Sequence, residues 1–138
     1  MDSVRIIERI EQGELKIEEQ FGAVKVRVEL EAADSLGLLL KRVELESTAK
    51  PADVQSVLKK QAAAIVEGLA FLSELKVIEV DGVSNAVQIR SRKPAGDGYV
   101  EIILRGGNFL SLERKPAALH ISRGDFERLT RDLTEIIG

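Results

Sequence analysis

The sequence predicts a single α+β domain over residues 1–138, with antiparallel sheet, a long central helix and a C-terminal helix. Apolar residues recur at three- and four-residue steps in two segments, near residues 51–75 and 124–137, as in amphipathic helices. In the other segments apolar and polar residues alternate, as in half-buried strands. Hairpin-length connections between these strands imply antiparallel pairing, in one sheet or two, because parallel neighbours need a long crossover.

The chain begins with an ambiguous stretch, which three strands follow. Residues 3–12 fit a short helix nearly as well as a strand, and both interpretations stay open. Residues 15–18 alternate as a strand, and Gly22 marks the turn into the clearest strand, residues 24–30. A third strand is expected at residues 39–46.

The long helix is predicted from about Pro51 to Leu75. Pro51 suits the first turn of a helix, where its missing N–H is not needed, and Asp53 complements the positive end of the helix. Ser122 and Asp125 have the spacing of a capping box, which predicts the second helix from about Gly124.

Between the helices the sequence predicts strands at residues 77–80, 86–92, 99–105 and 109–113. Asp81-Gly82 and Gly106-Gly107 mark hairpin turns between them. The two halves, residues 1–75 and 76–138, have similar length and order, so the chain resembles two tandem β4α units (ββββ-α-ββββ-α), a candidate duplication.

We expect one hydrophobic core, formed by the inward sides of the strands and helices. Its predicted members are Leu15, Ile17, Val24, Val26, Val28, Leu58, Ile65, Leu69, Leu72, Ile89, Val100, Ile102, Leu104, Phe126, Leu129 and Leu133.

The composition limits the compartment and the chemistry. No apolar run approaches the roughly 20 residues of a membrane-spanning helix, and the N-terminal stretch carries acids where a signal peptide is apolar. We therefore expect a cytoplasmic protein without a membrane partner. The chain has no cysteine, which excludes disulfides, thiol catalysis and thiolate metal sites.

Charge is unevenly distributed along the chain. The net charge is −3; residues 1–88 carry 11 Lys/Arg against 16 Asp/Glu, and residues 89–138 carry 9 against 7. The strongly basic surface typical of nucleic-acid-binding proteins is therefore weak, and restricted to the C-terminal third.

Few residues suggest catalysis. His120 is the only histidine, and no nucleophile motif accompanies it, so we interpret it as an exposed or cap-linked strand residue. We interpret the acidic pairs as part of a charged sheet face, beside Arg27 and other basic side chains. These pairs include Glu18-Glu19, Glu29 with Glu31, and Glu44 with Glu46. We predict no catalytic residue, cofactor or metal.

One set of side chains suggests a nucleic-acid surface. If the apolar residues of the second group of strands face inward, three arginines and two aromatic residues share the outer face: Arg90, Arg92, Tyr99, Arg105 and Phe109. Such a face stacks bases and neutralises the phosphates of a single strand. Glu101 and Glu113 on the same face oppose this interpretation.

Two resemblances follow from element order. Residues 99–137 form a strand, a Gly-containing hairpin, a second strand and an amphipathic helix entered near Phe126. This order is similar to PUR-repeat and Whirly-type proteins, which implies single-strand binding. The acidic first half also resembles small secretion-chaperone-like α/β domains, which are dimeric and bind unfolded partner segments. Neither resemblance includes motif residues that identify a family.

The favoured interpretation is a non-catalytic protein-interaction or scaffold domain that pairs with itself in a homodimer. The dimer prediction rests on the two similar halves and on the strand 24–30, whose edge needs covering unless it is central. Single-stranded nucleic-acid binding is the alternative, and a small-ligand binder or enzyme of unknown type is a third.

Overall fold

The chain forms an α+β domain in a computed structural model that describes residues 4–91 and 98–138. Three helices are described: α1 (Val4–Glu11), α2 (Val54–Gly68) and α3 (Arg123–Ile137). The strands are β1 (Lys16–Phe21), β2 (Val24–Ala33), β3 (Gly37–Ser47), β4 (Leu75–Asp81), β5 (Ala86–Ser91), β6 (Tyr99–Arg105), β7 (Phe109–Lys115) and β8 (Leu119–Ser122).

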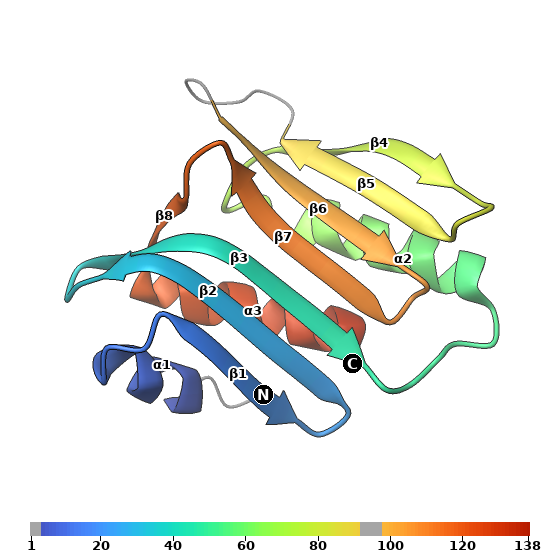
Figure 1. Cartoon of the computed structure of the whole chain (residues 1–138). Coiled ribbons are helices and arrows are strands. Elements are labelled where there is room, and N and C mark those ends of the chain that lie inside the picture. Colours follow the sequence, from blue (N-terminus) through green and yellow to red (C-terminus); the bar gives the residue numbers. More distant parts are fainter. Residues whose placement is uncertain (1–3, 92–97) are drawn as a thin grey trace.

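All the described strands belong to one antiparallel sheet. Seven follow the order β1-β2-β3-β7-β6-β5-β4, and β8 pairs with β3 beyond the end of β7. The pairing of β3 with β7 joins the two halves of the chain in the middle of this sheet (Figure 1). Helices α2 and α3 lie side by side on one face, here called the helix face, and α1 lies beside β1 (Figure 1). The opposite face is called the open face.

Two rows of residues cross the helix face from β1 to β4. Strand register gives the first as Ile17, Val28, Val43, Leu112, Ile102, Ile89 and Val77. The second contains Glu19, Val26, Leu45, Leu110, Leu104, Val87 and Val80. Their central members are buried beneath Leu58 and Ile65 of α2 and Phe126, Leu129 and Leu133 of α3. From β1 to β5 the two row members of each strand are two residues apart, which is the period from which the strands were predicted, whereas in β4 they are three apart.

Most of the expected core is buried, with two exceptions. Leu15 is 42% exposed because it lies in the bend before β1, at the edge of the sheet. Leu72 is only partly buried, in the turn after α2. The prediction that Leu15 belongs to the core is therefore wrong, because alternation identifies a side of the strand and not whether a helix covers it.

The predicted helices are present with different limits. The side chain of Asp53 caps α2 by accepting from the N–H of Ser56 at 3.1 Å, so the helix begins at Val54 and not at Pro51. It ends at Gly68, well before Leu75, because the following residues turn back toward β4.

The ambiguous N-terminal stretch forms a helix, α1, whose Ile6 and Ile10 are buried. In the described residues three strands precede α2 and five lie between α2 and α3, so the strand counts differ from two β4α units. The capping of α3 is confirmed, because the Ser122 hydroxyl accepts from the N–H of Asp125 at 3.1 Å. None of the described helices is long and apolar enough to cross a membrane.

The β6–β7 turn allows a test of local packing. Gly107 has φ +77°, and a Cβ there would lie 2.7 Å from Cγ of Pro51. Gly22 has φ +62° and open space around it. Both Gly→Ala changes should cost about 1–2 kcal/mol of folding free energy through left-handed strain. Gly107→Ala should cost about 1–3 kcal/mol more through overpacking. Urea unfolding measures both, and equal losses would show that the contact with Pro51 is unimportant.

Candidate functional site

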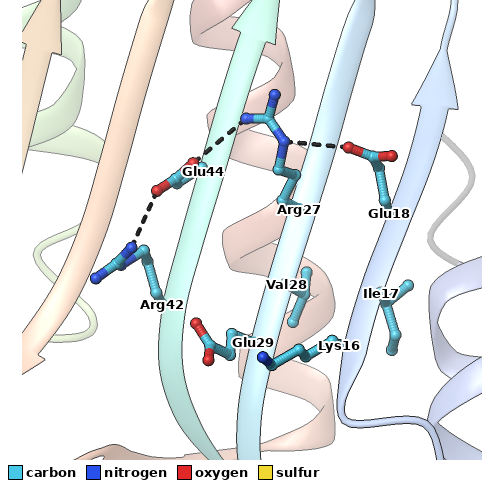
Figure 2. Close-up of a pocket in the computed structure, with 8 residues that line it drawn as sticks. All are labelled: Lys16, Ile17, Glu18, Arg27, Val28, Glu29, Arg42 and Glu44. Carbon is cyan, nitrogen blue, oxygen red and sulfur yellow. Dashed lines mark hydrogen bonds and ion pairs between the residues drawn. The ribbon is translucent and has the colours of Figure 1, made fainter.

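The open face is covered by ion-paired side chains. Figure 2 shows Arg27 of β2 between Glu18 and Glu44, which belong to the two neighbouring strands. Its Nε lies 3.1 Å from Oε1 of Glu18, and its Nη1 lies 3.3 Å from Oε2 of Glu44. Arg42 contacts the other carboxylate oxygen of Glu44 at 3.3 Å. The shallow hollow between these side chains, about 320 Å³, is thus lined by charges that already neutralise one another.

Four of the five residues expected in a nucleic-acid surface share the open face. The guanidinium of Arg90 lies 4.8 Å from the ring centre of Tyr99, and that of Arg105 lies 5.9 Å from the ring centre of Phe109. Register places both pairs on the side away from the helices. The fifth, Arg92, lies outside the described residues.

A carboxylate lies within this group. Glu101 of β6 is only 7% exposed and accepts hydrogen bonds from Gln88 at 2.9 Å, Arg90 at 3.0 Å and Lys115 at 3.2 Å. Burial raises the pKa of Glu101, but these three hydrogen bonds and the charge of Lys115 lower it more, so the net pKa lies below its ordinary value. Arg90 therefore already has an anionic partner within the sheet.

The remaining polar candidates do not converge on a reactive centre. His120 lies exposed on β8 beside a shallow hollow of about 410 Å³ that also includes Asp34. Burial of a reactive group is the usual sign of a catalytic site, and His120 lacks it. Across residues 4–91 and 98–138, no group of three or more His, Asp or Glu side chains is placed to hold a metal ion.

The two end strands of the sheet differ in how their outer sides are covered. At β1, two arginines of α1 reach the backbone. Arg5 donates to the carbonyl of Gln20 at 3.0 Å, and Arg9 donates to that of Glu18 at 2.6 Å. Arg9 is also held by Glu14 and Glu19 at 2.8 and 3.2 Å. These bonds satisfy outward-facing acceptors of β1, which a further strand would otherwise use.

At the other end, β4 keeps exposed apolar side chains, although α2 contacts it on the helix face. Val77 is 36% exposed, Ile78 51% and Val80 62%. Val83 in the following turn is 97% exposed. A register shift between Val77 and Glu79 marks a β-bulge, with Ile78 as the extra residue. We use "β4 edge" for the outer side of Leu75–Asp81.

An apolar groove lies beside the β4 edge on the helix face. Its volume is about 730 Å³, and its lining is Gln55, Leu58, Lys59, Ala62, Ala63, Val66, Glu67, Val77, Val80 and Val87. It exists because the side of α2 that faces β4 carries small residues, Ala62 and Ala63, where a Leu or Phe would fill the space. We call it the α2–β4 groove. Each apolar row of the sheet ends in it, at Val77 and at Val80.

One end of the groove is fastened by a side chain of α2. Nε2 of Gln55 donates to Oδ1 of Asn85 at 2.6 Å, which ties the start of α2 to the β4–β5 turn. In that turn the carboxylate of Asp81 accepts from the N–H groups of Val83 and Ser84 at 2.9 and 3.2 Å. Hydrogen bonds from Ser84 and Val83 lower the pKa of Asp81, so this carboxylate is ionised at neutral pH.

The sequence predicted a strand at residues 77–80 but did not identify it as an edge. Two signals were present. The adjacent apolar pair Val77-Ile78 breaks the two-residue period, which is typical of a bulge, and bulges are frequent at sheet edges. Val83 is an apolar residue in a hairpin turn, where polar residues dominate.

Comparisons of the chain with protein-family models, with curated proteins and with solved structures found no match.

Glu101→Gln should reduce stability at neutral pH by about 1–3 kcal/mol, because the anion accepts three hydrogen bonds. The folded-state pKa lies below the ordinary 4.5, so the contribution is fully present above pH 4.5 and is lost as pH falls through the folded-state value. The difference between wild type and variant, measured by urea unfolding across pH, should shrink in that acid range. Glu46→Gln, at a carboxylate 51% exposed, is the control and should change little. A Glu101→Gln difference independent of pH would contradict the ionic role.

Proposed function

We propose that this domain is a non-catalytic protein-interaction module. Its docking surface is the β4 edge together with the α2–β4 groove. The occupant is an extended polypeptide segment that pairs with β4 as an additional strand and places alternate side chains in the groove. The observation that carries this proposal is the combination of an apolar edge strand and an apolar groove on the same side of the sheet.

Strand addition suits both parts of this surface. An edge strand offers a row of N–H and C=O groups, and pairing with it gives main-chain hydrogen bonds of any sequence. Val77 and Val80 point to the groove, so an added strand with apolar residues on that face extends the two rows of the core. Burial of these exposed valines contributes roughly 25 cal/mol per Å² of apolar surface removed from water.

A selection experiment tests the proposal. Random peptides displayed on phage should yield, on the immobilised wild-type chain, sequences with apolar residues at alternating positions. Val80→Asp places a charge in the groove at a position already 62% exposed, so the fold should persist. A labelled selected peptide should bind this variant roughly tenfold more weakly in fluorescence anisotropy.

Leu36→Asp is the matched control, because Leu36 is 84% exposed in the distant β2–β3 turn. It should bind the peptide as the wild type does. Equal binding by the Val80→Asp chain would place the interaction elsewhere and contradict the proposed surface.

Single-stranded nucleic acid is a second candidate ligand, at the open face. It is favoured by the two arginine–aromatic pairs, Arg90 with Tyr99 and Arg105 with Phe109, on the same side of the sheet. It ranks second because the carboxylates of Glu101 and Glu113 lie among these pairs and repel phosphate.

For this second candidate, anisotropy with labelled single-stranded DNA and RNA should show binding that weakens as salt increases. Arg90→Ala/Arg105→Ala should weaken it by roughly tenfold or more. Arg5→Ala/Arg128→Ala is the matched control, because these arginines stack on Phe21 and Phe71 and do not lie on the open face. Absence of binding at low salt would eliminate this candidate.

A further inference from the structure

We infer that the segment that pairs with β4 is the β4 strand of a second copy of this chain. The inference rests on the proposed docking function of the β4 edge and names its occupant. The two strands run antiparallel about a two-fold axis that passes between Ile78 and Glu79. The two sheets thereby become one continuous sheet, with both α2 helices on the same face.

The charges of β4 favour this register. It places Lys76 opposite Asp81 of the second copy, twice across the axis. Lys76 pairs with Arg90 and Asp81 with Ala86 in the neighbouring strand, which puts both on the open face. The carboxylate of Asp81 is held in place by the β4–β5 turn. Opposite charges directly across two antiparallel strands are stabilising.

The apolar residues match in the same register. Val77 lies opposite Val80 of the second copy, and both point to the helix face. They are three residues apart, which in a regular strand would put them on opposite faces. The extra residue of the bulge, Ile78, restores the match.

Neighbouring registers match less well. An axis through Ile78 places Lys76 opposite Val80, and an axis through Glu79 places Val77 opposite Asp81. An axis between Val77 and Ile78 places Lys76 opposite Glu79, but it also places Glu74 opposite Asp81, and like charges directly across a strand pair are destabilising. The axis between Ile78 and Glu79 sets Val77 opposite Val80 and leaves no pair of like charges.

The α2 helix is complementary to itself under the same axis. It runs antiparallel to β4, since Gln55 bonds to the β4–β5 turn and Gly68 precedes the start of β4. The middle of α2 therefore lies at the middle of β4. Lys59 and Glu67, on the rim of the groove, are equally spaced about Ala63. A two-fold axis there brings Lys59 of one helix toward Glu67 of the other.

Besides these charged pairs, the inferred interface has an apolar interior. In each copy a groove of about 730 Å³ opens beside β4, and the pairing merges the two into one layer between the α2 helices. Stable interfaces bury roughly 1,200–2,000 Å² in total. A seven-residue strand ladder supplies only part of that area, and the merged grooves add apolar surface to it.

Cysteine cross-linking tests the register directly, because the chain has no cysteine of its own. A disulfide requires Cα atoms about 4.4–6.8 Å apart, which opposite residues satisfy. Val77→Cys chains mixed with Val80→Cys chains should form disulfide-linked dimers under mild oxidation, seen on a non-reducing gel. Either variant alone should link several-fold less, because like positions are offset by three residues, about 10 Å. Equal or absent linking in the mixture would overturn the inferred pairing.

The oligomeric state provides the second measurement. Light scattering at micromolar concentration should give a dimer for the wild type and a monomer for Val80→Asp. Lys76→Glu should raise the dissociation constant by roughly tenfold at low salt, and less at high salt. Lys60→Glu and Leu36→Asp, at exposed positions outside the groove, are the controls and should remain dimeric.

A monomeric wild type, or a dimer that Val80→Asp and Lys76→Glu leave intact, would overturn the inference. If the wild type is monomeric and still binds selected peptides through Val80, the docking function stands and only the second copy is wrong as its partner. If both dimerisation and Val80-dependent peptide binding are absent, the proposed docking function is wrong as well as the inferred partner.

Discussion

The architecture depends on the two apolar rows that cross the helix face of the sheet. Each row is continuous because antiparallel register sets one apolar side chain opposite the next from β2 to β4. The helices are placed where they bury these rows: α3 over the strands around β3, and α2 over those around β5. Helix α2 also contacts β4, the last strand of the rows, but it does not fill the space above that strand. Val77 and Val80 therefore stay partly exposed beside the groove.

The two faces of the sheet are stabilised by different interactions. On the helix face, stability comes from removing Val, Ile and Leu side chains from water. On the open face, Arg27 and Glu101 each connect neighbouring strands through charged hydrogen bonds. Exposed ion pairs of this kind contribute little individually, whereas Glu101 is buried enough for its bonds to matter. The open face is therefore polar, and its charged side chains are largely paired with one another, whereas the β4 edge carries exposed apolar side chains.

The local sequence pattern was sufficient to predict most of the helices and strands, but not how they are arranged in the sheet. Alternation identified β2, β6 and β7, and the Ser122 cap identified the start of α3, because each signal lies within a few residues. The edge position of β4 depends on the pairing of β3 with β7, between residues more than sixty positions apart, and no local pattern contains it. The dimer was expected partly because the edge of the strand 24–30 would need covering unless that strand were central. It is central, since β2 lies between β1 and β3, so this ground for a dimer does not apply. Alternation did place Arg90, Tyr99, Arg105 and Phe109 on one face, but not the hydrogen bonds that Arg90 and its neighbours make with Glu101.

The arginines of α1 have a consequence for how far such a sheet can extend. Bare strand edges at both ends would let copies add one after another, as in fibrous cross-β assemblies. Here Arg5 and Arg9 occupy the carbonyls of Gln20 and Glu18, two acceptors on the outer side of β1, which opposes the addition of a strand at this end of the sheet. If two β4 edges pair as inferred, growth by strand pairing at the ends of the sheet stops after a single step, because the pairing uses both edges. Helix α1 would then limit polymerisation of a protein whose opposite edge is rich in valine.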